Sequence, residues 1–294
     1  MKWEDFFAGL DSLFAQKDVT AAENYLARHL EAARNYGNNR YQLAVLNEQV
    51  GYYRNLSRFP QAFTACEQAM AIIAASDLTD KISAATTMLN VATALRAGGR
   101  ITEALEMYDA VNEIYAAALE ANDPRRAALY NNMAQTWVSR GDKQTVLVYL
   151  HKSLAILKTS PEHCSELAVT HSNIALIYIS LRNHEIAAQH LQAALSIFES
   201  LSYDSPNYPA ALAAMAQLLY INGDYSGAVG KYRLALSKTE ALFGQNANYA
   251  LICRNCARAC SLAGLWIEAG ELERKAEAAE ERLNLANATI QANE

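Results

Sequence analysis

The chain has 294 residues, a formal net charge of −6 at pH 7 and 52% hydrophobic residues. Its acidic and basic residues are interleaved, which argues against a basic face that binds the phosphates of nucleic acid. Few glycines and prolines in so hydrophobic a chain favour close-packed helices and argue against disorder.

The first seven residues carry Glu4 and Asp5 where a secretory signal would carry basic charge. No apolar run approaches the length that crosses a bilayer. Five cysteines are an odd number in a long chain with an ample core, so we expect reduced thiols rather than a disulfide framework. Together these features predict a soluble, cytoplasmic protein without a membrane partner.

A small residue recurs along the chain at steps of 42, 42, 41, 41 and 41 residues: Ala62, Ala104, Val146, Ala187, Ala228 and Ala269. Five positions earlier lies a turn position, occupied by Ser57, Gly99, Gly141, Arg182, Gly223 and Gly264. Twelve positions earlier lies a second compact residue, which is Val50, Ala92, Ala134, Ala175, Ala216 or Ala257. Self-similarity at this interval predicts a stack of like units rather than a globule with one core.

Each repeat divides into two helices, as the third copy illustrates. Residues 82–97 carry an apolar stripe of Met88, Val91, Ala92 and Leu95 at helical spacing, and two glycines end it. A second helix is expected over residues 101–119. In other copies a short acceptor follows the turn, where it can cap the second helix: Asp18, Asp142, Asn183 and Asp224.

Helix breakers recur between the repeats, at residues 77–80, 122–124, 159–161, 204–206 and 244–246. They predict seven antiparallel hairpins in one body over residues 1–294, with units near 1–37, 38–79, 80–121, 122–162, 163–204, 205–246 and 247–294. The charged segment 271–282 is expected to be a solvated cap helix, with self-association through helix pairing as the alternative.

These residues resemble the tetratricopeptide repeat motif. Ala134, Trp137 and Gly141 match its first half, and Gly223, Ala228 and Tyr232 match its second half. The family's usual unit has 34 residues, and the longer interval here looks more like the repeats of kinesin light chains and of many bacterial signalling proteins. The resemblance implies an all-α, right-handed superhelical solenoid that binds peptides on its concave surface.

One stripe of each first helix is not needed for packing, and we call it the first-helix stripe. Its central slot holds Glu48, Asn90, Asn132, Asn173, Ala214 and Asn255 in successive copies. Asparagine amides both donate and accept, so a ladder of them could hold an extended peptide backbone. The predicted partner-binding groove comprises Asn47, Glu48, Arg54, Asn55, Asn90, Arg96, Asn131, Asn132, Gln135, Asn173, Arg254, Asn255 and Arg258.

Two alternatives accompany this prediction. The asparagines could instead brace adjacent repeats, and the two roles can coexist. A clamp for a C-terminal carboxylate is disfavoured, because the slots around Asn90 and Asn132 hold Thr86, Leu89, Ala128 and Asn131. Arg54 and Arg96 occupy equivalent slots, so they are expected to lie side by side and to attract acidic groups.

The run Cys253, Cys256 and Cys260 could suggest a metal or an iron–sulfur cluster. Its members fall in the core slots of Met88, Val91 and Leu95, so we interpret them as packing residues and expect neither a metal nor a cofactor. His171 shares the slot of Met88 and is interpreted as a packed or hydrogen-bonded core residue. No recognisable nucleophile or phosphate-loop motif is present.

The sequence therefore predicts a non-enzymatic scaffold that binds a peptide or a partner helix in its groove. A regulatory sensor, whose solenoid changes pitch when a peptide binds, is the second hypothesis. An enzyme that uses the cysteine run is the third.

Overall fold

The computed structural model describes residues 3–16, 19–75, 81–202 and 205–292, with side chains described over residues 5–14, 19–75, 81–202 and 205–282. Over these ranges the regular structure is entirely helical, which confirms the predicted all-α class. In chain order the helices are α1 (Trp3–Gln16), α2 (Val19–Asn35), α3 (Asn39–Asn55), α4 (Phe59–Ala75), α5 (Lys81–Ala97), α6 (Ile101–Ala118), α7 (Pro124–Ser139), α8 (Lys143–Leu157), the 3-10 turn η1 (Pro161–His163), α9 (Cys164–Ser180), α10 (His184–Ser200), α11 (Tyr208–Ile221), α12 (Tyr225–Phe243), α13 (Ala247–Leu262) and α14 (Trp266–Ala292).

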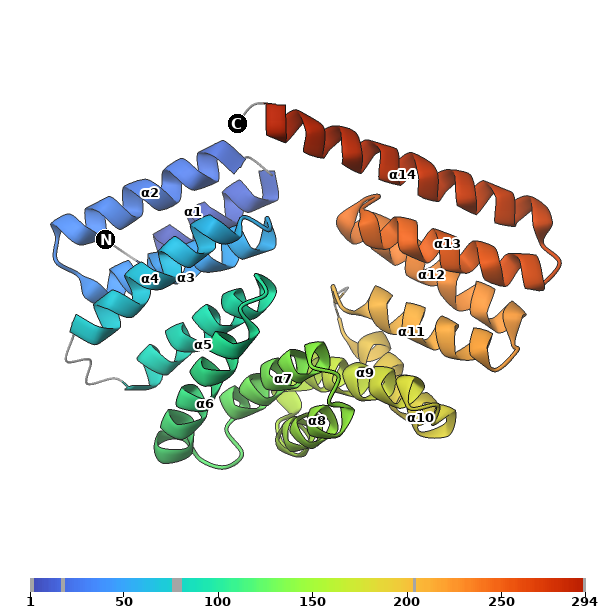
Figure 1. Ribbon diagram of the computed structural model, residues 1–294, viewed down its shortest axis with the longest axis horizontal. Helices are drawn as coiled ribbons and strands as arrows, with labels where there is room; N and C mark the ends of the chain where they lie inside the picture. The colour runs from blue at the N-terminus through green and yellow to red at the C-terminus, as the bar shows by residue number, and fades with distance from the viewer. Residues whose placement is uncertain (1–2, 17–18, 76–80, 203–204, 293–294) are drawn as a thin grey trace. The chain divides into compact units, whose positions relative to one another are not determined.

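The helices form two compact units, residues 1–141 with α1 to α7 and residues 142–294 with α8 to α14. Within each unit, consecutive helices pack as pairs: α1 with α2, α3 with α4, α5 with α6, α9 with α10, α11 with α12, and α13 with α14 (Figure 1). First helices of adjacent pairs also touch, as α3 and α5 do in the first unit and α9 and α11 do in the second.

The six predicted turn positions share one backbone conformation. Their φ angles are all positive, from 58° at Ser57 and Arg182 to 84° at Gly99 and Gly223. Glycine adopts this left-handed conformation without steric cost, whereas Ser57 and Arg182 carry a Cβ that crowds the following carbonyl. The turn is therefore a constant feature of the repeat, even where the glycine is missing.

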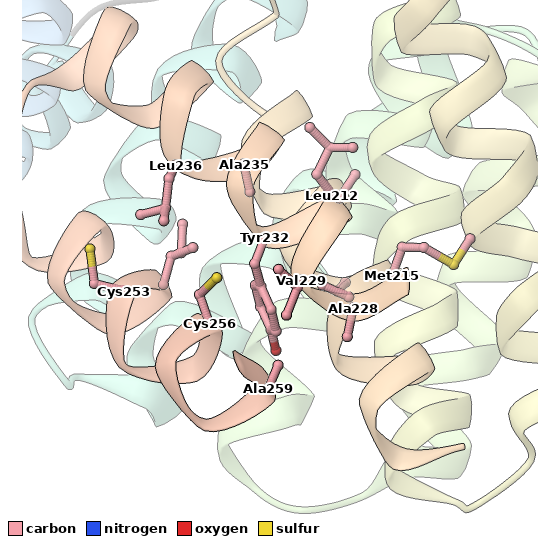
Figure 2. Packing of buried hydrophobic residues seen from close by; sticks show 14 of the residues in the cluster. Leu212, Met215, Ala228, Val229, Tyr232, Ala235, Leu236, Cys253, Cys256 and Ala259 are labelled. Carbon is pink, nitrogen blue, oxygen red and sulfur yellow. The ribbon is translucent and has the colours of Figure 1, made fainter. Parts of the chain in front are cut away.

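The two recurring small residues of each repeat are buried, as the sequence predicts. Ala62, Ala104, Ala187 and Ala228 are fully inaccessible to solvent, and Ala269 is 7% exposed. Small side chains here let the two helices of a hairpin approach closely, and larger neighbours fill the remaining space. In the second unit, Tyr232 of α12 lies among these buried residues near the α13 segment that carries Cys256 and Ala259 (Figure 2).

Three of the predicted helix caps are confirmed. Side chains of Asp142, Asn183 and Asp224 accept hydrogen bonds from backbone amides three residues later, at the starts of α8, α10 and α12. Asp18 lies outside the described residues, as do residues 77–80, the first of the five predicted breakers. The last hairpin differs, because Leu265 stands at the equivalent position before α14.

Among the described residues, no helix is both long and apolar enough to span a membrane.

Candidate functional site

The first-helix stripe of the first unit contains a network of side-chain hydrogen bonds. Asn90 Nδ2 of α5 donates to Asn47 Oδ1 of α3 over 3.1 Å, and Asn47 Nδ2 donates to Thr87 Oγ1 of α5 over 2.9 Å. Asn47 thus accepts from one residue of α5 and donates to another. Because these bonds join adjacent hairpins, the network fixes the position of α5 against α3.

A cavity of about 510 Å³ opens beside this network. Five of the predicted groove residues line it, namely Asn47, Glu48, Arg54, Asn55 and Asn90. Four of them lie on α3 and Asn90 lies on α5. Residues of both helices line one cavity because equivalent slots of adjacent repeats face the same way. The lining of this cavity therefore includes amide, carboxyl and guanidinium groups.

Two guanidinium groups lie near each other at the ends of α3 and α5. Burial, and secondarily the neighbouring charge of Arg96, lower the pKa of Arg54. Arg54 donates to Asn55 Oδ1 over 3.2 Å, and the buried Arg96 Nε has no hydrogen-bond partner among the described residues. In that part of the chain neither arginine pairs with a carboxylate, so both retain capacity for an anion.

Glu48 shares this cavity and has an environment that favours its neutral form. Burial chiefly, and the Asp11 carboxylate secondarily, raise the pKa of Glu48 above its ordinary value. A group that titrates higher than usual inside a cavity is typical of functional sites, although structural sites also perturb pKa values.

The predicted residues of α7 are arranged differently. Asn132 Nδ2 donates to the carbonyl of Ala128 in its own helix over 3.1 Å, and Gln135 is exposed. Asn131 is half-buried. This bond lies within α7, so it does not connect Asn132 to a neighbouring repeat.

In the second unit, the predicted residues do not form one polar cluster. Arg254 of α13 donates from Nε to Glu280 of α14 over 3.1 Å, and Glu273 lies 3.8 Å from another of its nitrogens, so this guanidinium helps to hold the last hairpin together. Arg258 is exposed. Asn173 is half-buried, and its amide nitrogen has no hydrogen-bond partner within the described ranges.

Asn255 lines a second cavity, of about 280 Å³, between α11 and α13. Its walls are mostly apolar, in contrast to those of the cavity in the first unit. The central slot in α11 is held by Ala214, so the slot equivalent to Asn255 has no amide in this copy.

The cysteine run is a core feature, as predicted. Cys253, Cys256 and Cys260 are fully buried, and burial raises the pKa of each thiol. Thiols in such surroundings are poor nucleophiles. The described side chains include no group of three or more His, Cys, Asp or Glu residues placed to hold a metal ion.

His171 is half-buried rather than fully buried, and its Nδ1 lies 3.0 Å from Nδ1 of His190. Burial, then the charges of His190 and Lys158, lower the pKa of His171 to about 4. This pair packs α9 against α10.

Three residues of the first cavity were not predicted from the sequence: Phe14, Gly51 and Tyr52. Phe14 of α1 and Tyr52 of α3 stack with ring centroids 5.4 Å apart. Phe14 belongs to the least regular repeat, so it has no clear equivalent position in the other repeats. The only sequence feature that could have indicated its role is that it is a large aromatic residue.

Solved structures with this fold come from several sources. The chain is 15% identical to the apo form of the quorum sensor NprR from B. thuringiensis, with 96% of this chain and 76% of that one covered and a TM-score of 0.66. It is 18% identical to BtubC (BKLC) from P. vanneervenii, with 84% and 92% covered and a TM-score of 0.61. It is 20% identical to a putative kinesin light chain with nearly identical repeats from Podosopora anserina, with 70% and 99% covered and a TM-score of 0.56.

No curated protein sequence matches the chain. The family model for the tetratricopeptide repeat matches residues 41–111, 83–159 and 166–241, which together cover more than half of the sequence. The recurring small residues, the left-handed turns and the paired helices all follow that repeat. This chain belongs to the tetratricopeptide repeat family.

Proposed function

We propose that this chain is a non-enzymatic interaction scaffold that binds a peptide segment or a helix of another protein along its first-helix stripe. The proposal includes the single continuous body over residues 1–294 and the cytoplasmic location expected from the sequence. The observation that carries it is the cavity of about 510 Å³ in the first unit, which brings five of the predicted groove residues together.

The chemistry of this cavity favours a segment with an acidic group. Arg54 and Arg96 place two cations close together, and burial makes their mutual repulsion costly unless an anion neutralises it. A carboxylate can accept two parallel hydrogen bonds from a guanidinium, which gives the contact a defined direction. The amides of Asn55 and Asn90 would then pair with the peptide backbone beside it.

Peptide display on the purified chain tests this proposal without knowledge of the natural partner. We expect selection from a random library to enrich Asp and Glu, and the double variant Arg54→Glu, Arg96→Glu to enrich Lys and Arg instead. Arg40→Glu is the matched control, since Arg40 lies on α3 too but is exposed at its other end. A selection that enriches no acidic residue, or one that is unchanged in the double variant, would contradict the proposal.

A second test separates binding from bracing. Asn90, Asn132 and Asn173 are replaced by Ala singly and together, folding is followed by circular dichroism, and partner recovery is measured by affinity capture and mass spectrometry. Retained folding with unchanged capture would reject the role of these amides in binding. Loss of both would assign them to bracing.

A peptide-responsive sensor is the second candidate. The similarity to a structure named as a quorum sensor favours it, although that similarity is one of fold. The sensor hypothesis requires a change in helix packing when the selected peptide binds. Small-angle X-ray scattering with and without that peptide measures such a change. Identical scattering profiles would reject the sensor hypothesis and leave the scaffold hypothesis standing.

A further inference from the structure

The cavity between α11 and α13 exists because one copy of the repeat carries unusually small side chains. Ala210, Ala213 and Ala214 of α11 line it, and the α13 residues in the same slots are Leu251, Arg254 and Asn255. Alanine maintains the helix at no cost in propensity while leaving space beside it. The hollow of about 280 Å³ is smaller than the pockets that enclose whole drug-sized ligands, so its size suits one side chain.

The mouth of this cavity is apolar and open to solvent. Leu251 of α13 is 56% exposed, and Leu176 of α9 and Phe243 of α12 are each 45% exposed. All three line the cavity. Large apolar side chains gathered at the mouth of a hollow are typical of a binding surface, because their exposure to water costs free energy in the unbound protein.

Thr239 of α12 contributes an unusual polar group to the wall. It is 2% exposed, and its hydroxyl has no hydrogen-bond partner within the described part of the chain. Several other helical threonines bond to the carbonyl four residues earlier, as Thr64 of the second helix α4 does to Pro60 over 3.1 Å and Thr136 of the first helix α7 does to Asn132 over 2.9 Å. Since a buried hydroxyl without a partner is destabilising, this exception indicates a group that is satisfied by something else.

We propose that the cavity receives a tyrosine side chain of the bound partner, with the ring between the apolar walls and the phenol hydroxyl hydrogen-bonded to Thr239. This inference rests on the proposed function, because it assumes that a partner segment runs along the first-helix stripe. Asn255 and Gln217 also line the cavity, and their amides would bond the backbone next to that tyrosine. A phenylalanine would fill the same space and leave Thr239 unpaired, whereas a lysine or arginine would bury an unpaired charge.

The experiment uses p-cresol and toluene as probes, since they are the side chains of tyrosine and phenylalanine without a backbone. Both are titrated into the full chain and followed by two-dimensional amide NMR. We expect p-cresol to shift the amides of Ala213 and Asn255 and to bind about five-fold more tightly than toluene, as one added hydrogen bond implies. Thr239→Val should abolish this preference and leave the chain folded.

Two further variants complete the design. Ala213→Leu should fill the cavity and weaken both probes together, so it tests the location even if Thr239→Val fails to fold. Thr136→Val is the matched control, because it makes the same substitution at a buried position of α7 whose hydroxyl is already bonded. It should leave the five-fold preference unchanged.

Equal affinities of the two probes for the unaltered chain would overturn the assignment, and so would a preference that persists in Thr239→Val. If neither probe binds, the assignment is overturned as well. This includes the case in which a second copy of the chain occupies the cavity. The Arg54→Glu, Arg96→Glu variant distinguishes this inference from the proposed function. It lies in the other unit and should bind p-cresol normally even if peptide selection fails.

Discussion

The first-helix stripes of the two units use the same slots for different chemistry. Between α3 and α5, polar side chains bond to one another across adjacent hairpins and line a cavity with charged groups. Between α11 and α13, alanines leave a mostly apolar hollow. The difference shows that the repeat specifies the backbone and its packing, while the residues in a few unpacked slots specify the chemical groups that each surface presents.

The largest loss of stability is expected at a position where both units have a buried tyrosine. Tyr108 and Tyr232 both lie four residues after the recurring alanine and are 0% and 3% exposed. Replacing either by Ala leaves a cavity and should lower the free energy of unfolding by about 4 kcal/mol. Urea denaturation measures this loss, and a loss below about 1 kcal/mol in either unit would show that its core tolerates the gap.

Acid should destabilise the second unit through His171. Its pKa is about 4 in the folded chain, chiefly because of burial, against 6.5 for the ordinary side chain. Stability is therefore fully present above pH 6.5 and is lost as the pH falls toward 4, because the unfolded chain takes up the proton first. The expected loss is about 2 to 3 kcal/mol.

Urea denaturation at a series of pH values tests this dependence. His171→Gln should flatten the profile between pH 6.5 and pH 4, because glutamine does not titrate there. A profile as steep as that of the unaltered chain would assign the acid sensitivity to other groups.

The asparagines of the two stripes should differ in their effect on stability. Asn90→Ala removes a bond between hairpins and leaves Asn47 Oδ1 without that donor, so a loss of about 1 kcal/mol is expected. Asn255→Ala should change the stability by less than about 0.5 kcal/mol, because Asn255 lies at a cavity wall and replacement by Ala favours the helix. Equal losses in the two variants would mean that Asn255 also has a bracing role.

A smaller effect than that of Asn90→Ala is expected at two of the described turns that lack glycine, one in each unit. Ser57 and Arg182 both have a φ angle of 58°, where a Cβ is unfavourable. Ser57→Gly and Arg182→Gly should each raise the free energy of unfolding by about 0.5 to 1 kcal/mol, despite the greater entropy of the unfolded chain. Glycine→Ala at Gly99 or Gly223 should have the opposite sign, and a melting temperature that does not move in any of the four variants would rule out strain at these turns.

Much of the helical framework could be predicted from the sequence because it depends on local rules. The third repeat was expected to have helices over 82–97 and 101–119, and α5 and α6 cover Lys81–Ala97 and Ile101–Ala118. The left-handed turns, the buried small residues and the burial of Cys253 follow from the same spacing. Each of these features involves residues within one hairpin or its immediate neighbour.

The candidate site was less predictable, since its members meet only through packing between hairpins. The sequence predicted that Arg54 and Arg254 line the same groove. In the structure Arg254 bonds to Glu280 of the following helix, whereas Arg54 bonds to its neighbour Asn55. Nothing in the sequence indicated that Phe14 lies beside Tyr52. Such contacts depend on helix rotation and separation, which the spacing of small residues constrains only loosely.

Helical periodicity and the space that small residues leave were enough to predict the repeat, the paired helices, their turns and the stripe of side chains left free of packing. Packing between hairpins set which stripe residues bond to one another, which line a cavity and which hydroxyl has no partner among the described residues. These outcomes depend on side-chain positions across neighbouring hairpins, where a shift of one or two ångströms makes or breaks a hydrogen bond.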